Sequence, residues 1–201
     1  MEPRRTFLDV AALPKHAFGS RDLLWWGNAG FMAIEGTMFA MLLATLFYLR
    51  SVGGEWPPSP WMPPDLLWGT LNTAVMLASI WPSKKAEKAA HALDAHAMRY
   101  WMVIADLFGV LFLVLRGFEL AHLNVRWDSN AYGSIVWLVL GFHTTHLATD
   151  AVESWVLTRE LFKKTDARRF VDVAEDCGYW DFVVLVWVPL YVVVYLLPRW
   201  S

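Results

Sequence analysis

The chain contains five apolar stretches separated by polar segments. As an α-helix, each stretch is long enough, or nearly so, to cross the roughly 30 Å hydrocarbon core of a bilayer. The second is the shortest and would extend roughly 24 Å as a helix, close to the minimum. The pattern predicts an all-α integral membrane bundle of five transmembrane helices, formed by a single domain over residues 1–201. The predicted spans are residues 23–49, 66–81, 100–123, 132–157 and 179–197.

The polar segments predict how the spans are connected. Residues 51–65 contain five prolines, which exclude a helix and predict an ordered, extended cap at the bilayer surface. Pro82 is expected to end the second span, with Ser83 as the N-cap of a helix that extends into water over residues 83–100, either separate from the third span or continuous with it. A basic loop is expected over residues 159–170.

Lysine and arginine are distributed unequally between the two sides of the predicted bundle. Thirteen lie in the amino-terminal arm, in the segment after the second span and in the loop after the fourth. Only Arg50, Arg126 and Arg199 fall on the opposite side. Because positively charged loops remain in the cytoplasm, we expect a cytoplasmic N-terminus, an outer C-terminus and a multi-pass protein of the cell inner (plasma) membrane.

The fourth span carries a narrow ionisable stripe. His143, His146, Asp150 and Glu153 follow one another at steps of three, four and three residues, which places them within roughly 80° of one helix face. The rest of the helix surface is mostly Val, Leu, Ile, Ala and Trp. Such a stripe cannot face lipid, so it must face other helices or a water-filled crevice.

Other ionisable residues lie inside the predicted spans and are candidates for an intramembrane polar network. Glu35 and His143 share a depth near the midplane, so the geometry allows a contact between them that would either join helices or support chemistry. Arg116 and Glu119 are three residues apart and can pair locally. Asp181 is expected near a helix start, where the helix dipole favours a negative charge. The network candidates are Asp106, Arg116, Asp150, Glu153 and Asp181.

Composition narrows the classes of function. The chain is 57% hydrophobic and only 18% charged, and its net charge of −2 predicts no nucleic-acid partner. The single Cys177 excludes an intramolecular disulfide or a multi-thiolate metal site. Only His143 and His146 are deep histidines, and both lie on one span, so we expect no bis-histidine haem; a metal site from them and Glu35 lacks supporting residues. We therefore expect no catalytic residue, metal or cofactor in this chain.

Five motifs, one per predicted span, together resemble subunit III of the haem-copper oxidases. None is specific alone, but all five occur in order with the expected topology. The motifs are IEGTMF at residues 34–39, LNT at 71–73 with Ser79, GVLFLVLRGFE at 109–119, GFHTTH at 141–146, and YWDF at 179–182 followed by Trp187, Tyr191 and Tyr195.

The chain departs from the family pattern at three positions. Arg116 stands where the family has Gln, Asp181 where its last helix has His, and Val184 where it has Asp. Any family role for that His–Asp pair therefore does not transfer. The length resembles the five-helix bacterial form of the family.

The resemblance implies an accessory subunit without catalysis of its own. Its partners would be the catalytic subunit I and subunit II of an aerobic terminal oxidase, with cytochrome c oxidase preferred over quinol oxidase. Haem and copper would reside in those partners, while this chain would hold phospholipid, stabilise the catalytic subunit and support proton uptake. By motif match, Glu35, Glu119, His143 and His146 would organise the bundle and its lipid cleft.

Three other functions are alternatives to the accessory-subunit interpretation. The first is a subunit-III-like protein associated with nitric oxide reductase. The second is a small proton-coupled transporter with Glu35, His143 and Asp150 as a relay, although the sequence has no inverted repeat. The third is a membrane cytochrome, which a Soret band in the isolated chain would support.

Overall fold

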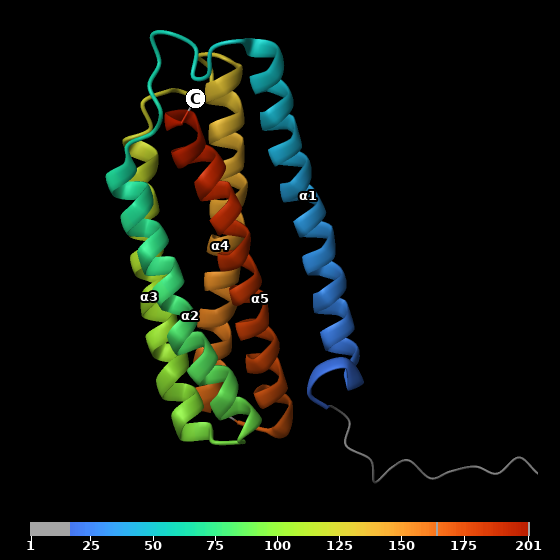
Figure 1. The fold of residues 1–201 in the computed structure, drawn as a ribbon. Helices are drawn as coiled ribbons and strands as arrows, with labels where there is room; N and C mark the ends of the chain where they lie inside the picture. Colours follow the sequence, from blue (N-terminus) through green and yellow to red (C-terminus); the bar gives the residue numbers. More distant parts are fainter. Residues whose placement is uncertain (1–16, 164, 201) are drawn as a thin grey trace, which may run out of the picture.

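Five long helices make up the bundle (Figure 1). The computed structural model describes residues 17–163 and 165–200, and no strand occurs among them. The helices run alternately up and down, so that the start of α1 and the C-terminus lie at opposite ends of the bundle (Figure 1). The elements are η1 (Gly19–Arg21), α1 (Leu23–Gly53), α2 (Leu66–His91), α3 (Ala95–Ala121), α4 (Ala131–Lys163), α5 (Ala167–Tyr191), η2 (Val192–Leu196) and η3 (Leu197–Arg199).

Four of the long helices begin at an aspartate N-cap. Each aspartate has extended backbone angles, and its carboxylate accepts a hydrogen bond from an amide of the first turn. These bonds satisfy donors that no helical carbonyl can reach. The caps and the residues whose amides donate to them are Asp22 and Leu24, Asp65 and Leu67, Asp94 and Ala97, and Asp166 and Arg169.

The prediction that Pro82 ends the second helix is wrong. Helix α2 continues through Pro82 to His91, and Ser83, expected as an N-cap, is buried within it. A proline removes one helical hydrogen bond, and here the apolar packing of the following turns offsets that loss: Ala86 and Ala90 lie fully buried in a cluster with residues of α3, α4 and α5. The helix does not continue into α3, because a turn at Leu93 with φ of 56° separates the two.

The basic segment is also mostly helical, which corrects the predicted loop over residues 159–170. Helix α4 extends to Lys163, and α5 begins at Ala167, well before the predicted start at Tyr179. The added turns of α5 are amphipathic, since Phe170, Val173 and Cys177 are buried among neighbouring helices. The many charges of this segment conceal its buried face in the sequence pattern, which therefore predicts a loop.

Four helices in the described part of the chain are long and apolar enough to cross a membrane: α1, α3, α4 and the helical run Ala167–Arg199. Helix α2 is not one of them, because polar residues such as Asn72, Thr73 and Ser79 interrupt its apolar section. The observed architecture is therefore an all-helical bundle with five long helices, four of them membrane-capable.

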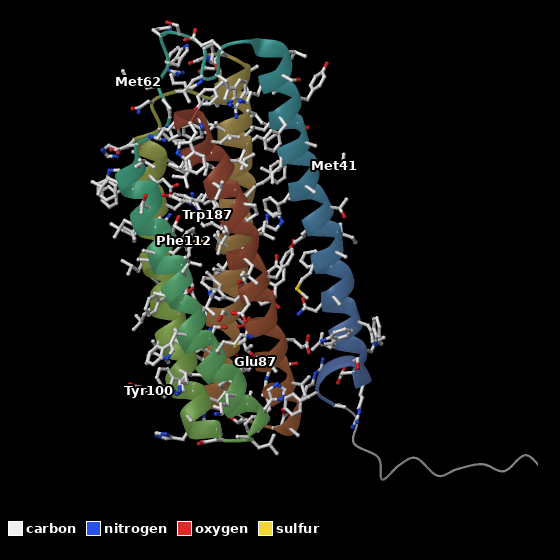
Figure 2. The ribbon with its side chains drawn as sticks, viewed as in Figure 1. Met41, Met62, Glu87, Tyr100, Phe112 and Trp187 are labelled. Atoms are coloured by element: carbon white, nitrogen blue, oxygen red, sulfur yellow. The ribbon has the colours of Figure 1, made fainter. Side chains whose placement is uncertain are left out.

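Helices α2 to α5 pack closely together, while α1 stands at one side and contacts α4 and α5 (Figure 1). Figure 2 shows the consequence for side chains: Phe112 and Trp187 point between helices, whereas Met41 on α1 points away. Phe112 and Trp187 are 1% and 0% exposed, and Met41 is 67% exposed.

The two ends of the bundle differ in character. We call the end with residues 54–65 and the C-terminus the proline-rich end, and the end with the α2–α3 and α4–α5 connections the basic end. Residues 54–65 form no helix, as the prolines predicted, whereas residues 51–53 belong to α1, which corrects the predicted start of the cap. Asn124 donates to the Pro63 carbonyl at 2.9 Å, and the Trp56 ring packs edge-on against Tyr132, so the cap is fixed to the bundle.

Candidate functional site: buried polar networks between the helices

The largest buried network lies in the half of the bundle toward the proline-rich end. Arg116 donates to Glu119 at 2.9 Å, which confirms the predicted local pair. Glu119 also accepts from Asn72 of α2 at 2.6 Å and from the Tyr195 hydroxyl of η2. One carboxylate thus joins three elements, and the two charged side chains are each 1% exposed.

Aromatic rings complete the surroundings of Arg116. Its guanidinium lies 4.2 Å from the centroid of the Trp187 ring and 5.0 Å from that of Phe112. A delocalised guanidinium is stabilised by ring faces when water is excluded. The Trp187 indole in turn donates to Thr73 of α2 at 2.8 Å, which fixes the ring in place.

His143 belongs to this same network and does not pair with Glu35, although their depths would allow it. The Nε2 atom of His143 lies 3.1 Å from the Val183 carbonyl, and Nδ1 lies 3.4 Å from Arg116. Because a carbonyl only accepts, Nε2 donates and Nδ1 accepts from Arg116, so the ring is neutral. The imidazole is fully buried and packs on Trp187 with a centroid distance of 4.7 Å.

The partner of Glu35 is His146, one helical turn from His143. Glu35 Oε1 lies 3.0 Å from His146 Nε2, and the Tyr179 hydroxyl donates to Oε2 at 2.7 Å. This group joins α1 to both α4 and α5. Depth alone could not separate His143 from His146, because the rotation of α4 decides which imidazole faces α1.

The ionisable stripe of α4 only partly enters the packed core. His143 and Asp150 are buried, His146 is half-buried and Glu153 is exposed. His146, Asp150 and Glu153 line a cavity of about 300 Å³ between α1, α4 and α5. The stripe therefore faces helices at one end and a crevice at the other, as the sequence predicted.

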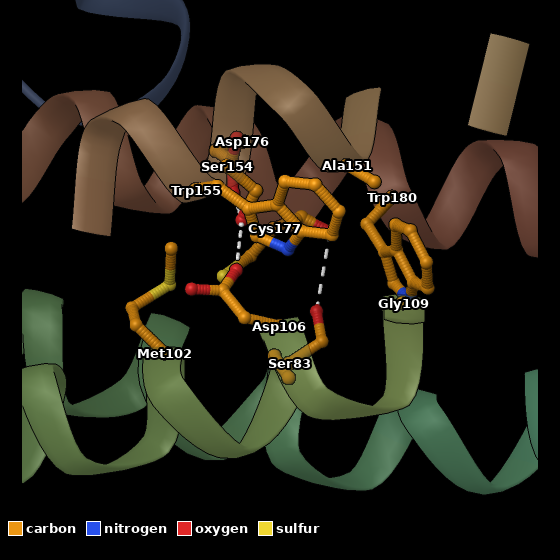
Figure 3. A pocket seen from close by; sticks show the side chains of 11 residues that line it. Ser83, Met102, Asp106, Gly109, Ala151, Ser154, Trp155, Asp176, Cys177 and Trp180 are labelled. Atoms are coloured by element: carbon orange, nitrogen blue, oxygen red, sulfur yellow. Dashed lines mark hydrogen bonds between the residues drawn. The ribbon is translucent and has the colours of Figure 1, made fainter. Parts of the chain in front are cut away.

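A second polar group joins α3, α4 and α5 toward the basic end (Figure 3). The Ser154 hydroxyl lies 3.0 Å from Asp106 and 3.2 Å from Asp176. Asp106, Ser154 and Asp176 line a cavity of about 20 Å³, room for one water molecule. The sequence pattern indicated Asp106 but not the other two residues. Ser154 is not ionisable, and Asp176 lies outside the predicted fifth span.

Asp181 has a different role from the one expected. It lies deep within α5 rather than at its start, so the helix dipole does not explain it. Its carboxylate lies 2.5 Å from Lys84 Nζ of α2 and accepts from the Ser83 hydroxyl at 3.3 Å. Asp181 therefore joins α5 to the part of α2 that continues past Pro82.

The described residues contain no group of three or more His, Cys, Asp or Glu side chains placed to hold a metal ion. The deep imidazoles instead bond to a carbonyl, an arginine and a carboxylate of this chain. These charged and polar groups bond one helix to another in the interior of the bundle, where they are shielded from lipid.

The comparisons with known proteins identify the family. The family model for cytochrome c oxidase subunit III matches residues 8–200. The chain belongs to this family. A relative named "Probable cytochrome c oxidase subunit 3" from Mycobacterium leprae is 30% identical over 188 residues, which cover 90% of this chain and 92% of the relative.

Relatives from other bacteria extend the likeness. Cytochrome c oxidase subunit 3 of Synechocystis is 27% identical, covering 89% of this chain and 78% of its own length. Cytochrome c oxidase subunit 3 of Corynebacterium diphtheriae is also 27% identical, and the match covers 94% of this chain and 96% of the relative. In this subunit III chain the polar networks are built largely by the family-like motifs, since Glu35, Asn72, Glu119, His143 and Tyr179 all fall within them.

Proposed function

We propose that this chain is the accessory subunit III of an aerobic haem-copper oxidase and carries out no catalysis itself. The match of the subunit III family model to nearly the whole chain is the observation that carries the proposal. Its partners are the catalytic subunit I and subunit II, which hold the haem and copper. Cytochrome c is the preferred electron donor, because the relatives are named cytochrome c oxidase subunits.

The internal chemistry of the bundle supports an accessory role. The buried charges form bonds that cross helices: Glu119 joins α2, α3 and η2, and Glu35 joins α1, α4 and α5. In a bilayer, such bonds help to hold helices together where apolar burial alone provides little net association. The residues Glu35, Glu119, His143 and His146 thus organise the bundle rather than react.

The cavity beside α1 supports a role in holding lipid. Toward the basic end, a cavity of about 470 Å³ is lined by apolar Leu24, Phe31, Val156 and Leu157 together with carboxylates. A phospholipid placed there would occupy the crevice between α1 and the α4–α5 pair. Shielding this side of the catalytic subunit would support proton uptake during turnover.

The orientation in the membrane follows from charge. We propose a cell inner (plasma) membrane location with the basic end in the cytoplasm, where Lys85, Lys88, Arg159 and Lys163 lie on helix ends. The proline-rich end and the C-terminus then face outward. Helix α2 completes the five passes, with its charged final turns in the cytoplasmic interface.

The test compares the oxidase complex with and without this chain. A tag on the chain should recover a larger haem-copper subunit in mild detergent. The complex that lacks the chain should keep a normal haem spectrum and initial activity, but lose activity faster over successive turnovers at neutral and alkaline pH. Slower proton delivery leaves reactive oxygen intermediates waiting longer, which explains the expected decay. Equal decay and equal proton pumping with and without the chain would reject the protective role.

A further inference from the structure

Two adjoining cavities open between α1 and the α4–α5 pair in the half of the bundle toward the basic end. Their volumes are about 470 and 300 Å³, and Phe31, Asp150, Glu153 and Tyr179 line both. The shared residues place one continuous crevice along α4. Its deep end lies at Asp150, and its rim lies near Glu160 and Arg169.

Asp150 is the buried acid of this crevice that has an oxygen without a hydrogen-bond partner among the described residues. It is 3% exposed, and that oxygen is its Oδ2 atom. Two neighbouring acids already have partners: Glu35 bonds to His146 and Tyr179, and Asp176 bonds to Ser154. A buried carboxyl is costly without a hydrogen-bond donor, so Asp150 is a site at which an external donor would be stabilised.

No lysine or arginine lines the deep end of the crevice among the described residues. Arg169 is the cation in the lining of the larger cavity, and it is held near the rim by Asp172 at 3.3 Å and Glu160 at 4.0 Å. Within residues 17–163 and 165–200, no ion pair involves Asp150 or Glu153. The crevice therefore favours a cationic ligand over an anionic one.

The other residues that line the crevice favour an organic cation over a metal ion. The described carboxylates are not placed to hold a metal ion. The Phe31 and Tyr179 rings stack with a centroid distance of 5.8 Å, and Val156 adds an aliphatic wall. Ring faces attract organic cations, aliphatic walls pack against methylene groups, and an ammonium offers three donors to carboxylates.

We propose that this crevice binds a primary alkylammonium group, with Asp150 and Glu153 accepting its hydrogen bonds and Phe31 and Tyr179 flanking its hydrocarbon. The group comes either from an aminophospholipid headgroup or from a free amine of the cytoplasm. With a lipid source, the inference deepens the lipid-holding part of the proposed function and rests on it.

The test is a binding titration on the full-length chain, purified in detergent and stripped of lipid. Native mass spectrometry follows adducts of dioleoyl phosphatidylethanolamine and of its N-acetylated derivative, which lacks the ammonium. The amine-bearing lipid should bind about tenfold more tightly, as expected for a charge-assisted hydrogen bond. Asp150→Asn should abolish the preference, and Glu153→Gln, at an exposed position with little effect on folding, should reduce it.

The matched control is Asp128→Asn, which removes a carboxylate from an exposed loop at the opposite end and should leave the preference unchanged. Competition with butylamine distinguishes the sources: displacement of the lipid assigns the site to the ammonium alone, and a retained preference assigns it to the lipid headgroup. Equal binding of the two lipids, or an unchanged preference in Asp150→Asn, overturns the proposal. Because the assay uses the chain alone, its failure is distinct from failure of the accessory role in the complex.

Discussion

Each buried charge in this bundle needs specific partners, and Arg116 is the clearest case. Arg116 occupies the position where the resemblance predicts Gln, and it is buried at 1% exposed. Glu119 supplies the opposite charge, the Trp187 and Phe112 rings cover the guanidinium, and His143 accepts a further hydrogen bond. Each of these contacts matters because an uncompensated charge in this position would face only protein and lipid.

Neutralising Glu119 should therefore be more harmful than neutralising both partners. Glu119→Gln leaves Arg116 buried without its carboxylate and should lower the free energy of unfolding by about 3–5 kcal/mol. The double variant Arg116→Gln/Glu119→Gln should recover much of that loss. Chemical denaturation in detergent measures both, and a single variant as stable as the wild type would contradict the argument.

Glu35 and Asp181 offer a second comparison at the residue scale. Glu35→Ala leaves the Tyr179 hydroxyl and His146 without their acceptor, at about 1–3 kcal/mol for each unmade bond. Asp181→Ala should cost less, because the Lys84 side chain is 54% exposed and keeps Glu87 at 2.8 Å. Thermal unfolding of the two variants tests the order, and equal losses would refute it.

The helices themselves depend on close contacts that the hydrophobic pattern does not reveal. Gly69 of α2 lies against the Tyr195 ring near the proline-rich end, and a β-carbon there would stand 2.5 Å from a ring carbon. Tyr195 is fully buried and donates to Glu119, so its ring cannot move freely. The approach of α2 to the end of α5 therefore requires glycine for space rather than for backbone freedom.

Gly69→Ala should destabilise the bundle by about 1–3 kcal/mol through this overpacking. Gly117→Ala on α3 is the matched control, since no atom lies within 4 Å of the added carbon. It should be neutral or stabilise the helix by up to about 1 kcal/mol. Denaturation midpoints of the two variants measured side by side test the difference, and similar midpoints would show that Tyr195 can be displaced at little cost.

The whole molecule has two chemically distinct ends, and the positive-inside rule predicts which of them lies in the cytoplasm. Single cysteines introduced by Lys85→Cys and Lys163→Cys should react with an impermeant thiol reagent only after the cells are opened. Gly54→Cys and Ser129→Cys should react in intact cells. Cys177 is 2% exposed and should contribute little background. Labelling of the Lys85 and Gly54 sites from the same side would reject the five-pass arrangement.

Hydrophobic pattern and family-like motifs were sufficient for the coarse architecture. Apolar runs predicted the all-helical bundle, and five motifs in order predicted the family that the comparisons confirm. The pair of Arg116 and Glu119 was also predictable, because residues three apart on a helix are neighbours whatever the tertiary structure. The apolar runs, the motifs and the pair three residues apart can each be recognised from residues that are close together in the sequence.

Only the tertiary structure decided which side chains meet across helices. The rotation of α4 about its axis determines that Glu35 meets His146 rather than His143. Packing of α2 against α3 and α5 carries the helix through Pro82 and brings Lys84 to Asp181. Helix rotation and end position depend on the summed packing of many apolar contacts, so residues far apart in the chain determine them together.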